Sequence, residues 1–339
     1  MKRPNIKGSS VAVVPSRRSL RPRIVEDVEG GGLSSGGLYF SSEKKDIEFF
    51  PSGCTLLDCI LGGGWAVGRV ANIVGDKSSG KTLLAMEAAA NFLQVYPHGH
   101  VKYKENESAF DPPYAVALGI PMDKIDVEED LNTVEDLFKD LDALIKASDD
   151  DEPILYIVDS LDALSDDAEM ARDIGQGSYG TAKAKNMSEM FRRLVRKLKQ
   201  KRVAVLIVSQ VRDNIGISFG KKTTRSGGRA LDFYASQVLW LTYIKQLKRT
   251  VSKQERPVGV IIRAKCEKLK VGLPFRSCDF TLTFGFGVED ELASREFLKE
   301  IGEGALAKLE GAELRAAVIK EWYNIERTFL PVKAKYGAS

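Results

Sequence analysis

The segment "GDKSSGKT", from Gly75 to Thr82, follows the apolar run of residues 69–74 and precedes a stretch, residues 83–95, with helical composition. Its spacing fits the pattern of a phosphate-binding loop placed between a strand and a helix. Gly75 and Gly80 allow the backbone to curl so that successive N–H groups face one point, and the positive end of the helix dipole adds to that field. The alternative, a simple glycine-rich turn, does not explain the lysine and threonine. The segment therefore predicts a site for a nucleoside triphosphate in an α/β fold.

The predicted nucleotide contacts of this loop are Gly75, Asp76, Lys77, Ser78, Ser79, Gly80, Lys81 and Thr82. Lys81 is expected to reach the β and γ phosphates, and the hydroxyl of Thr82 is expected to bind Mg²⁺. A second magnesium contact is expected from Asp159, which ends the hydrophobic run "ILYIVD". Taken alone, an aspartate after such a run is more often a turn former or helix cap. The phosphate loop upstream favours the metal-binding interpretation, with ATP and Mg²⁺ as ligands.

The composition excludes several other classes of protein. The chain has 339 residues, of which 43% are hydrophobic and 29% charged, and its formal net charge is only +3. Affinity for a polyanion must therefore come from local clusters of Lys and Arg. The four cysteines and two histidines lack the spacing of a zinc site, and no apolar run is long enough for a membrane span. We expect a cytoplasmic protein with reduced cysteines and no membrane contact.

Changes in composition divide the chain into three parts. Residues 1–45 form a basic, Gly/Ser-rich arm, interpreted either as a polymerisation or DNA contact or as a solvated tail. Residues 46–287 alternate apolar runs with helical stretches, which is typical of a mostly parallel sheet flanked by helices, with an antiparallel edge formed by the later runs. Residues 288–339 have helical periodicity and predict a small C-terminal helical region.

Several motifs, taken in order, resemble those of the RecA-type recombinase family over residues 50–287. They are the segment leading into the phosphate loop, "NESAFDPPYAVALGI", "IVDSLDAL", "VSQVRDNIGISFGKKTTRSGGRALDFYAS" and "CEKLKVGLPF". The resemblance implies a RecA-like P-loop ATPase core. It also implies a DNA-dependent ATPase whose nucleotide lies between adjacent protomers.

The resemblance assigns roles around the nucleotide. Glu107 corresponds to the catalytic glutamate that polarises the attacking water, although Glu105 is a competing candidate. Asp111 and Tyr114 correspond to the residues that hold and stack the adenine. Gln210 is expected to sense the γ phosphate; its position at the end of an apolar strand fits this role, and a capped strand end is the alternative.

Two further lysines, Lys268 and Lys270, correspond to residues that reach the nucleotide of the neighbouring subunit. On a strand, alternate residues share one face, so this spacing suits two cations aimed at one anion. An ordinary exposed strand face is the alternative.

Two segments are expected to bind DNA, the first near residues 172–181 with the helix that follows it and the second near residues 211–229. Glycines, cations and interleaved apolar side chains suit the grip of a stretched single strand, and solvated flexible loops are the alternative. The match of the first segment needs one inserted residue, so Lys183 competes with Lys185. The predicted contacts are Arg172, Ile174, Gly175, Tyr179, Gly180, Lys185, Ser188, Arg192, Arg212, Ile215, Gly216, Phe219, Gly220, Arg225, Gly227, Gly228 and Arg229.

The resemblance implies an ATP-dependent recombinase that forms helical filaments of many copies on single-stranded DNA, pairs it with a homologous duplex and exchanges strands. The short ends favour a phage-encoded or divergent member, acting in the host cytoplasm in the former case. The main alternative is a RecA-fold protein that coats single-stranded DNA or assists another recombinase without exchanging strands. A ring-forming helicase shares the core, but the two glycines of the second DNA-binding segment argue against it.

Overall fold

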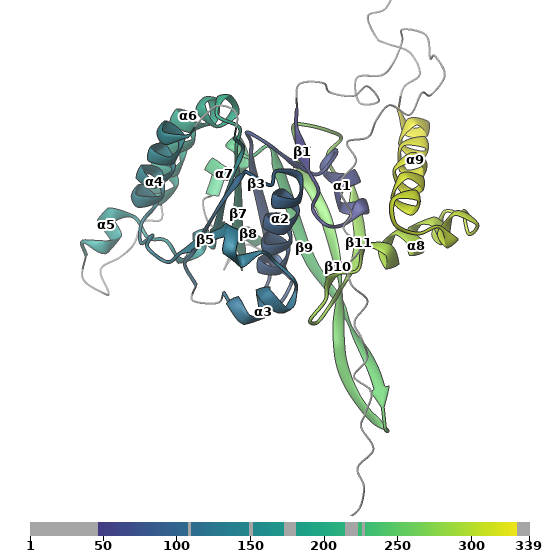
Figure 1. Ribbon diagram of the computed structural model, residues 1–339. Helices are drawn as coiled ribbons and strands as arrows, with labels where there is room; N and C mark the ends of the chain where they lie inside the picture. The colour runs from purple at the N-terminus through teal and green to yellow at the C-terminus, as the bar shows by residue number, and fades with distance from the viewer. Residues whose placement is uncertain are drawn as a thin grey trace, which may run out of the picture. The chain divides into compact units, whose positions relative to one another are not determined.

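We analysed a computed structural model of the chain, which describes residues 47–107, 110–148, 152–172, 181–213, 223–225 and 228–330. The strands in these ranges are β1 (Phe49–Phe50), β2 (Trp65–Ala66), β3 (Val70–Gly75), β4 (His100–Glu105), β5 (Ile125–Glu128), β6 (Ile154–Asp159), β7 (Val203–Asp213), β8 (Thr223–Arg225), β9 (Gln237–Val251), β10 (Gln254–Leu269), β11 (Ser277–Thr283) and β12 (Gly287–Val288). All but β1 and β2 belong to one large sheet, which is the centre of the fold (Figure 1).

The strand order of this sheet is β12-β11-β10-β9-β3-β7-β6-β4-β5, with β8 paired to β7. The neighbours from β9 through β3, β7, β6 and β4 to β5 run parallel, whereas β9, β10, β11 and β12 are antiparallel. Strands β3 and β6 are buried at every position, which is why their sequences read as continuous apolar runs. The predicted α/β class with a mostly parallel sheet and an antiparallel edge is confirmed.

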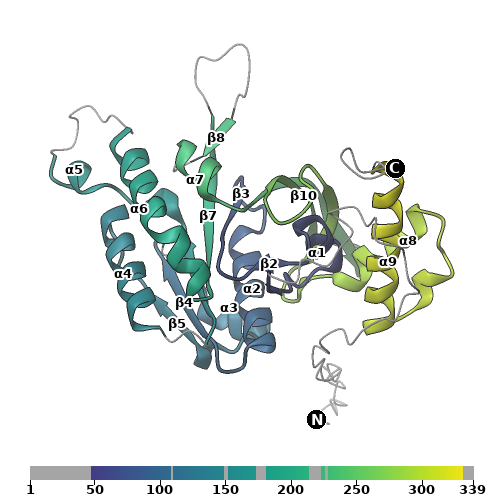
Figure 2. The same ribbon diagram turned by 90° about the horizontal axis from the view of Figure 1, so that it is seen from above.

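The helices are α1 (Thr55–Leu61), α2 (Lys81–Val95), α3 (Pro112–Ala117), α4 (Val134–Ala147), α5 (Asp167–Met170), α6 (Thr181–Gln200), α7 (Gly228–Tyr234), α8 (Asp290–Glu300) and α9 (Gly311–Phe329), with 3₁₀ turns η1 (Met122–Lys124), η2 (Leu161–Ala163) and η3 (Leu306–Lys308). The hydrophobic core has two layers. Helices α1, α2, α8 and α9 pack in one layer, and α4, α6 and α7 pack in the other (Figure 2). None of the helices in the described ranges is long and apolar enough to cross a membrane.

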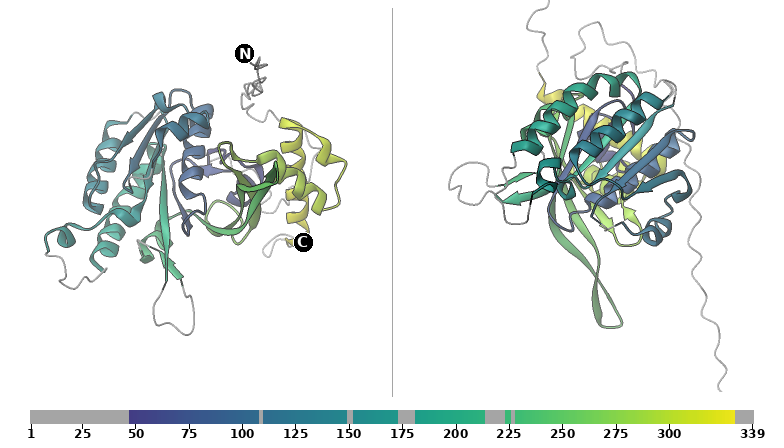
Figure 3. Two further views of the ribbon diagram at one scale, coloured as in Figure 1. Left: turned by 90° about the horizontal axis from the view of Figure 1, so that it is seen from below. Right: turned by 90° about the vertical axis from the view of Figure 1, so that its left-hand side faces the viewer.

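A long hairpin made by β9 and β10 extends well beyond the body of the protein (Figure 3). Its base is buried, but almost every residue from Thr242 on β9 through Pro257 on β10 is exposed. The hairpin tip therefore makes no contribution to the core.

The C-terminal helices share the core of the sheet. Leu298 on α8 and both Leu314 and Val318 on α9 are fully buried in the same layer as α1 and β11. A bidentate ion pair between Arg276 and Glu326 on α9 adds a polar contact. Helices α8 and α9 therefore pack directly against the sheet.

Candidate nucleotide site and its neighbours

The phosphate loop joins the end of β3 to the start of α2, as the sequence predicts. Gly80 has φ 83°, in the left-handed region, and a Cβ atom there would overlap the side chain of Leu282 on β11, so only glycine suits this position. The carbonyl oxygen of Asp76 accepts two hydrogen bonds, from Lys81 Nζ at 2.7 Å and from Ser79 Oγ at 2.8 Å. Helix α2 begins at Lys81, and the first N–H groups of a helix have no partners within it. The loop therefore offers main-chain donors of the kind that bind anions at helix N-termini.

The charge of Lys81 is set by its surroundings. Burial lowers the pKa of its ammonium group, while the carboxylates of Glu107, Asp159, Asp76 and Asp162 act in the opposite direction. Partial desolvation strengthens the attraction between this cation and a phosphate. The ammonium group of Lys81 thus lies among carboxylates, and a polyphosphate in the loop would compete with them for this cation.

Asp159 is almost completely buried, at 3% exposure, and lies at the end of β6. Its Oδ2 atom accepts a hydrogen bond of 2.7 Å from the hydroxyl of Tyr103. Burial raises the pKa of Asp159, and hydrogen bonds from Tyr103 and Thr82 oppose the shift. The carboxylate and the Thr82 hydroxyl are therefore adjacent, and both are hard oxygen donors of the kind that Mg²⁺ prefers.

Glu107, Ser160 and Gln210 converge beside the phosphate loop. The Oε1 atom of Glu107 accepts hydrogen bonds from the Ser160 hydroxyl and, at 2.6 Å, from Gln210 Nε2. In the sheet, Gln210 pairs with Gly75, the first residue of the loop. The side chain of Gln210 thus lies between the loop and the predicted general base.

The two candidate bases have different environments. Glu105 is buried, with 2% exposure, and its Oε1 accepts the main-chain N–H of Glu107 at 2.9 Å. Glu107 is exposed. Of the two carboxylates, Glu107 is the one open to solvent, while Glu105 holds the main chain of the turn that carries it.

The predicted base-binding residues lie on α3. Asp111 caps this helix by accepting the N–H of Tyr114 at 3.1 Å. The Tyr114 hydroxyl accepts the N–H of Gly285 at 3.4 Å, in the turn between β11 and β12. That turn carries Phe284, an aromatic side chain with 56% exposure. The sequence analysis did not single out Phe284, whose turn the fold brings against α3 through the contact between Gly285 and Tyr114.

The side chains of Lys268 and Lys270 both reach the main-chain carbonyl of Phe233. Lys268 lies near the C-terminal end of β10, just after an irregularity in the pairing of β10 with β9. Lys270 lies just beyond the strand. Both ammonium groups donate to the carbonyl oxygen of Phe233 at 2.9 Å, and Lys268 also donates to that of Asp232. Cations at the last carbonyls of a helix are favourable. In the isolated subunit the two lysines therefore hold the C-terminal end of α7.

The structure describes only part of the predicted DNA-binding set. Along α6, Lys185 and Arg192 are exposed and Ser188 is half-buried, with its hydroxyl donating to the Ala184 carbonyl at 2.9 Å. Arg172 donates through Nε to the carbonyl of Ala168 at 3.0 Å. Gly228 begins α7. The side chains or whole residues of Ile174, Gly175, Tyr179, Gly180, Arg212, Ile215, Gly216, Phe219, Gly220, Arg225, Gly227 and Arg229 lie outside the described part.

Lys183, the competitor of Lys185, has a different position. Its Nζ donates to the carbonyl of Leu161 at 3.0 Å and also to that of Leu164. Its ammonium group is thus directed into the protein. Of these two lysines, Lys185 is the one whose side chain is exposed to solvent.

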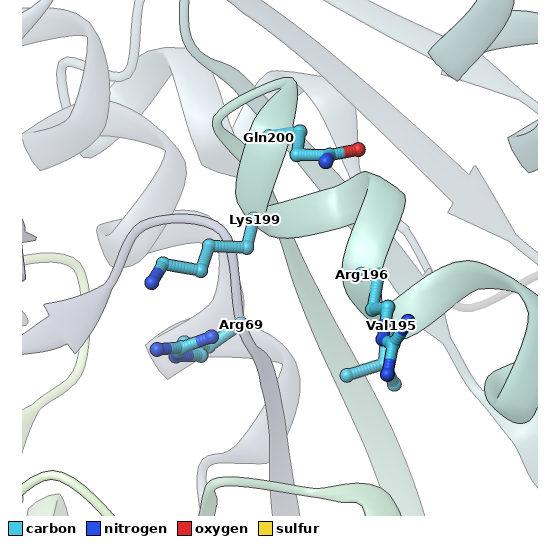
Figure 4. A pocket seen from close by; sticks show the side chains of 5 residues that line it. All are labelled: Arg69, Val195, Arg196, Lys199 and Gln200. Atoms are coloured by element: carbon cyan, nitrogen blue, oxygen red, sulfur yellow. The ribbon is translucent and has the colours of Figure 1, made fainter.

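A hollow of about 380 Å³ lies at the opposite edge of the sheet, where β3 begins and α6 ends (Figure 4). It is lined by Arg69, Val195, Arg196, Lys199 and Gln200. None of these lining residues belongs to the phosphate loop, and ligands of parallel α/β sheets bind at the carboxyl ends of the strands, whereas this hollow lies where β3 begins.

The parallel sheet, the phosphate loop at its carboxyl edge and the adjacent acidic strand end define a P-loop nucleotide-binding protein of the α/β class. The RecA N-terminal domain family model matches residues 34–289. Protein RecA of Streptomyces ambofaciens is 36% identical over 249 residues, 73% of this chain and 64% of that protein. Protein RecA of Leifsonia xyli is 33% identical over 287 residues, 84% of this chain and 74% of that protein. The chain belongs to the RecA family, and it spans 64% of the length of the Streptomyces relative.

Proposed function

We propose that this protein is an ATP-dependent DNA recombinase. In this proposal it binds ATP and Mg²⁺, assembles into a helical filament on single-stranded DNA, and pairs that strand with a homologous duplex. Family membership supports DNA recombination in general, and the arrangement around Gln210 supports the link between nucleotide and DNA. The proposed place of action is the cytoplasm, and the proposed partners are DNA and further copies of this chain.

The observation that carries the proposal is the position of Gln210. Its main chain pairs with Gly75, its amide donates to Glu107 at 2.6 Å, and residues 211–229, the second predicted DNA-binding segment, follow it directly. A phosphate at the loop competes for the same amide. Gln210 contacts Glu107, the proposed general base, and directly precedes the second predicted DNA-binding segment. A change in its side chain with the bound nucleotide therefore links nucleotide state to DNA affinity.

The residues present fit ATP with magnesium. The loop N–H groups and Lys81 suit the phosphates, while Thr82 and Asp159 supply the oxygen ligands for the metal. When bound, Mg²⁺ neutralises charge on the phosphate oxygens. Glu107 is proposed to polarise the attacking water, and Tyr114 and Phe284 to flank the purine. Lys268 and Lys270 are proposed to leave the α7 carbonyls and reach the nucleotide of an adjacent copy.

The first test is the rate of ATP hydrolysis with and without single-stranded DNA, with the Lys81→Ala variant as control. We expect DNA to stimulate the rate, and we expect Lys81→Ala to lose nucleotide-dependent DNA binding. Unchanged ATP-stimulated binding in the variant would contradict the proposed site.

The second test separates strand exchange from DNA coating. Filaments formed with a non-hydrolysable ATP analogue are viewed by electron microscopy, and joint molecules between single-stranded circles and homologous linear duplex are assayed with ATP. Joint molecules are the expected result. Filaments without joint molecules would favour an accessory coating protein.

A further inference from the structure

The turn η2 directly follows the acidic end of β6 and contacts the flanks of both predicted DNA-binding segments. It begins after Ser160, whose hydroxyl donates to Glu107. Its central residue is Asp162, and its carbonyl groups face the start of α6. The motif "IVDSLDAL" contains this turn, but no role was assigned to Asp162 from the sequence. Hydrogen bonds join the turn and the preceding Ser160 to Glu107, Gln210 and Lys183.

The first contact joins η2 to Gln210. Strand β6 pairs with β7 only as far as Val158 opposite Ile207, so the N–H of Gln210 lies beyond the ladder. The Oδ2 atom of Asp162 accepts this N–H at 2.7 Å. A carboxylate that accepts a main-chain N–H is a charge-assisted hydrogen bond, stronger than a neutral one. Asp162 thus fixes the main chain from which the Gln210 side chain projects.

The second contact joins η2 to α6. The half-buried Lys183 donates to the carbonyl oxygens of Leu161 and Leu164, at the two ends of the turn. Lys183 stands in the first turn of α6, directly after residues 172–181. A lysine shared by two carbonyls fixes the helix start relative to the turn.

We propose that Asp162 and Lys183 are positioning residues that make η2 the link between the nucleotide site and both DNA-binding segments. The inference rests on the proposed function. Asp162 holds the residue before the second segment, and Lys183 holds the residues after the first. Any nucleotide-dependent shift of Ser160 or Glu107 is passed through η2 to both flanks, because the turn is tied to each by a hydrogen bond.

The test measures the coupling itself. The dissociation constant for fluorescent oligo(dT) is measured with a non-hydrolysable ATP analogue and with ADP. The value with ADP is divided by the value with the analogue, and this ratio is compared between variants. This ratio expresses the coupling between sites and is reciprocal by thermodynamic linkage. It separates coupling from simple loss of folding, which lowers both affinities together.

Asp162→Ala is expected to lower the ratio about tenfold, the size expected from one lost charge-assisted hydrogen bond. Asp162→Asn keeps an oxygen acceptor for the Gln210 N–H and is expected to stay within about threefold of wild type. Lys183→Met keeps the aliphatic stem, loses the donor, and is expected to lower the ratio to a similar extent. Asp123→Ala, an exposed acid in η1, and Lys199→Met, an exposed lysine at the far end of α6, are matched controls expected to match wild type.

A normal ratio in both Asp162→Ala and Lys183→Met, in proteins that melt at the wild-type temperature, would overturn the inference. An equal fall in the ratio for Asp162→Asn and Asp162→Ala would also reject the hydrogen-bond explanation. The amide oxygen of the asparagine should still accept the N–H of Gln210 and so preserve the coupling. If wild type itself binds DNA equally with both nucleotides, the proposed function fails, and η2 then has nothing to couple. These outcomes are distinguishable because wild type is measured first.

Discussion

Lys104 offers the sharpest test of the packing. Its side chain is fully buried on β4, yet it carries a charge next to three carboxylates. It pairs with Glu128, with Asp130 at 2.8 Å and with Asp140 at 3.5 Å. Burial alone lowers the pKa of Lys104, but hydrogen bonds from its ammonium group to Asp130 and Glu128 outweigh that effect and raise it. The perturbation is Lys104→Met, which keeps the volume and removes the charge.

The expected loss of stability in Lys104→Met follows from the three carboxylates that remain without their cation. Removing one partner of a buried ion pair costs about 3–5 kcal/mol. Here Glu128, Asp130 and Asp140 keep 29%, 59% and 24% exposure, so water screens part of the leftover charge. We therefore expect a loss of about 2–3 kcal/mol in the free energy of unfolding. For a chain of this size, that corresponds to a Tm lower by about 3–5 °C.

The effect depends on pH with a definite sign. The hydrogen bond from Lys104 lowers the pKa of Asp130, so its contribution is present above the unfolded value of about 3.9 and lost as the pH falls through the folded value. The raised pKa of Lys104 keeps its contribution below about pH 10.4, and the contribution is lost as the pH rises through the folded value. The difference between wild type and Lys104→Met should thus be full at pH 7 and shrink below pH 4.

Urea unfolding followed by tryptophan fluorescence measures this difference, since Trp65 is buried in the core. The matched control is Lys102→Met, because Lys102 is more exposed, at 22%, and its carboxylates lie at 3.3 and 3.6 Å. The control should cost about 1 kcal/mol or less. Equal stability of Lys104→Met and wild type at pH 7, or a difference that grows in acid, would refute the reasoning.

Three further predictions concern the site. Glu107→Gln should lower ATP hydrolysis by at least about 100-fold and keep ATP-dependent DNA binding in a filter assay; loss of both would reject its role as base. Lys270→Ala should abolish DNA-stimulated hydrolysis while destabilising the subunit by only about 0.3–1 kcal/mol, the value of a cation at a helix end, and a large drop in Tm would instead mark it as structural. Tyr103→Phe removes the donor to Asp159, raises the pKa of that carboxyl further, and should weaken Mg²⁺-dependent binding of a fluorescent ATP analogue about tenfold; an unchanged magnesium titration would contradict this.

Local motifs allowed much of the fold to be predicted. The phosphate loop is contiguous in sequence, so its glycines, Lys81 and Thr82 could be recognised without knowing the strand order. The buried strands β3 and β6 also revealed themselves as continuous apolar runs. Asp159 could be placed at a strand end for the same reason.

Contacts set by strand order could not be predicted. Tyr103 reaches Asp159 only because β4 pairs with β6, and Gln210 meets the phosphate loop only because β7 lies beside β3. The sequence also presents Lys104 as an interruption of an apolar strand, whereas the fold buries it among acids contributed by other elements. The contact between Tyr114 and Gly285 could not be predicted either, because it joins α3 to the distant turn between β11 and β12.

The central claim is that each nucleotide is shared by two copies of the chain. It is tested by mixing Glu107→Gln with the double variant Lys268→Ala/Lys270→Ala, each inactive alone, and measuring ATP hydrolysis on single-stranded DNA. In an equal mixture, about one interface in four combines an intact Glu107 with intact lysines from the adjacent copy, because a head-to-tail interface joins two different surfaces. The account predicts recovery of about a quarter of the wild-type rate. A mixture as inactive as its components would contradict it.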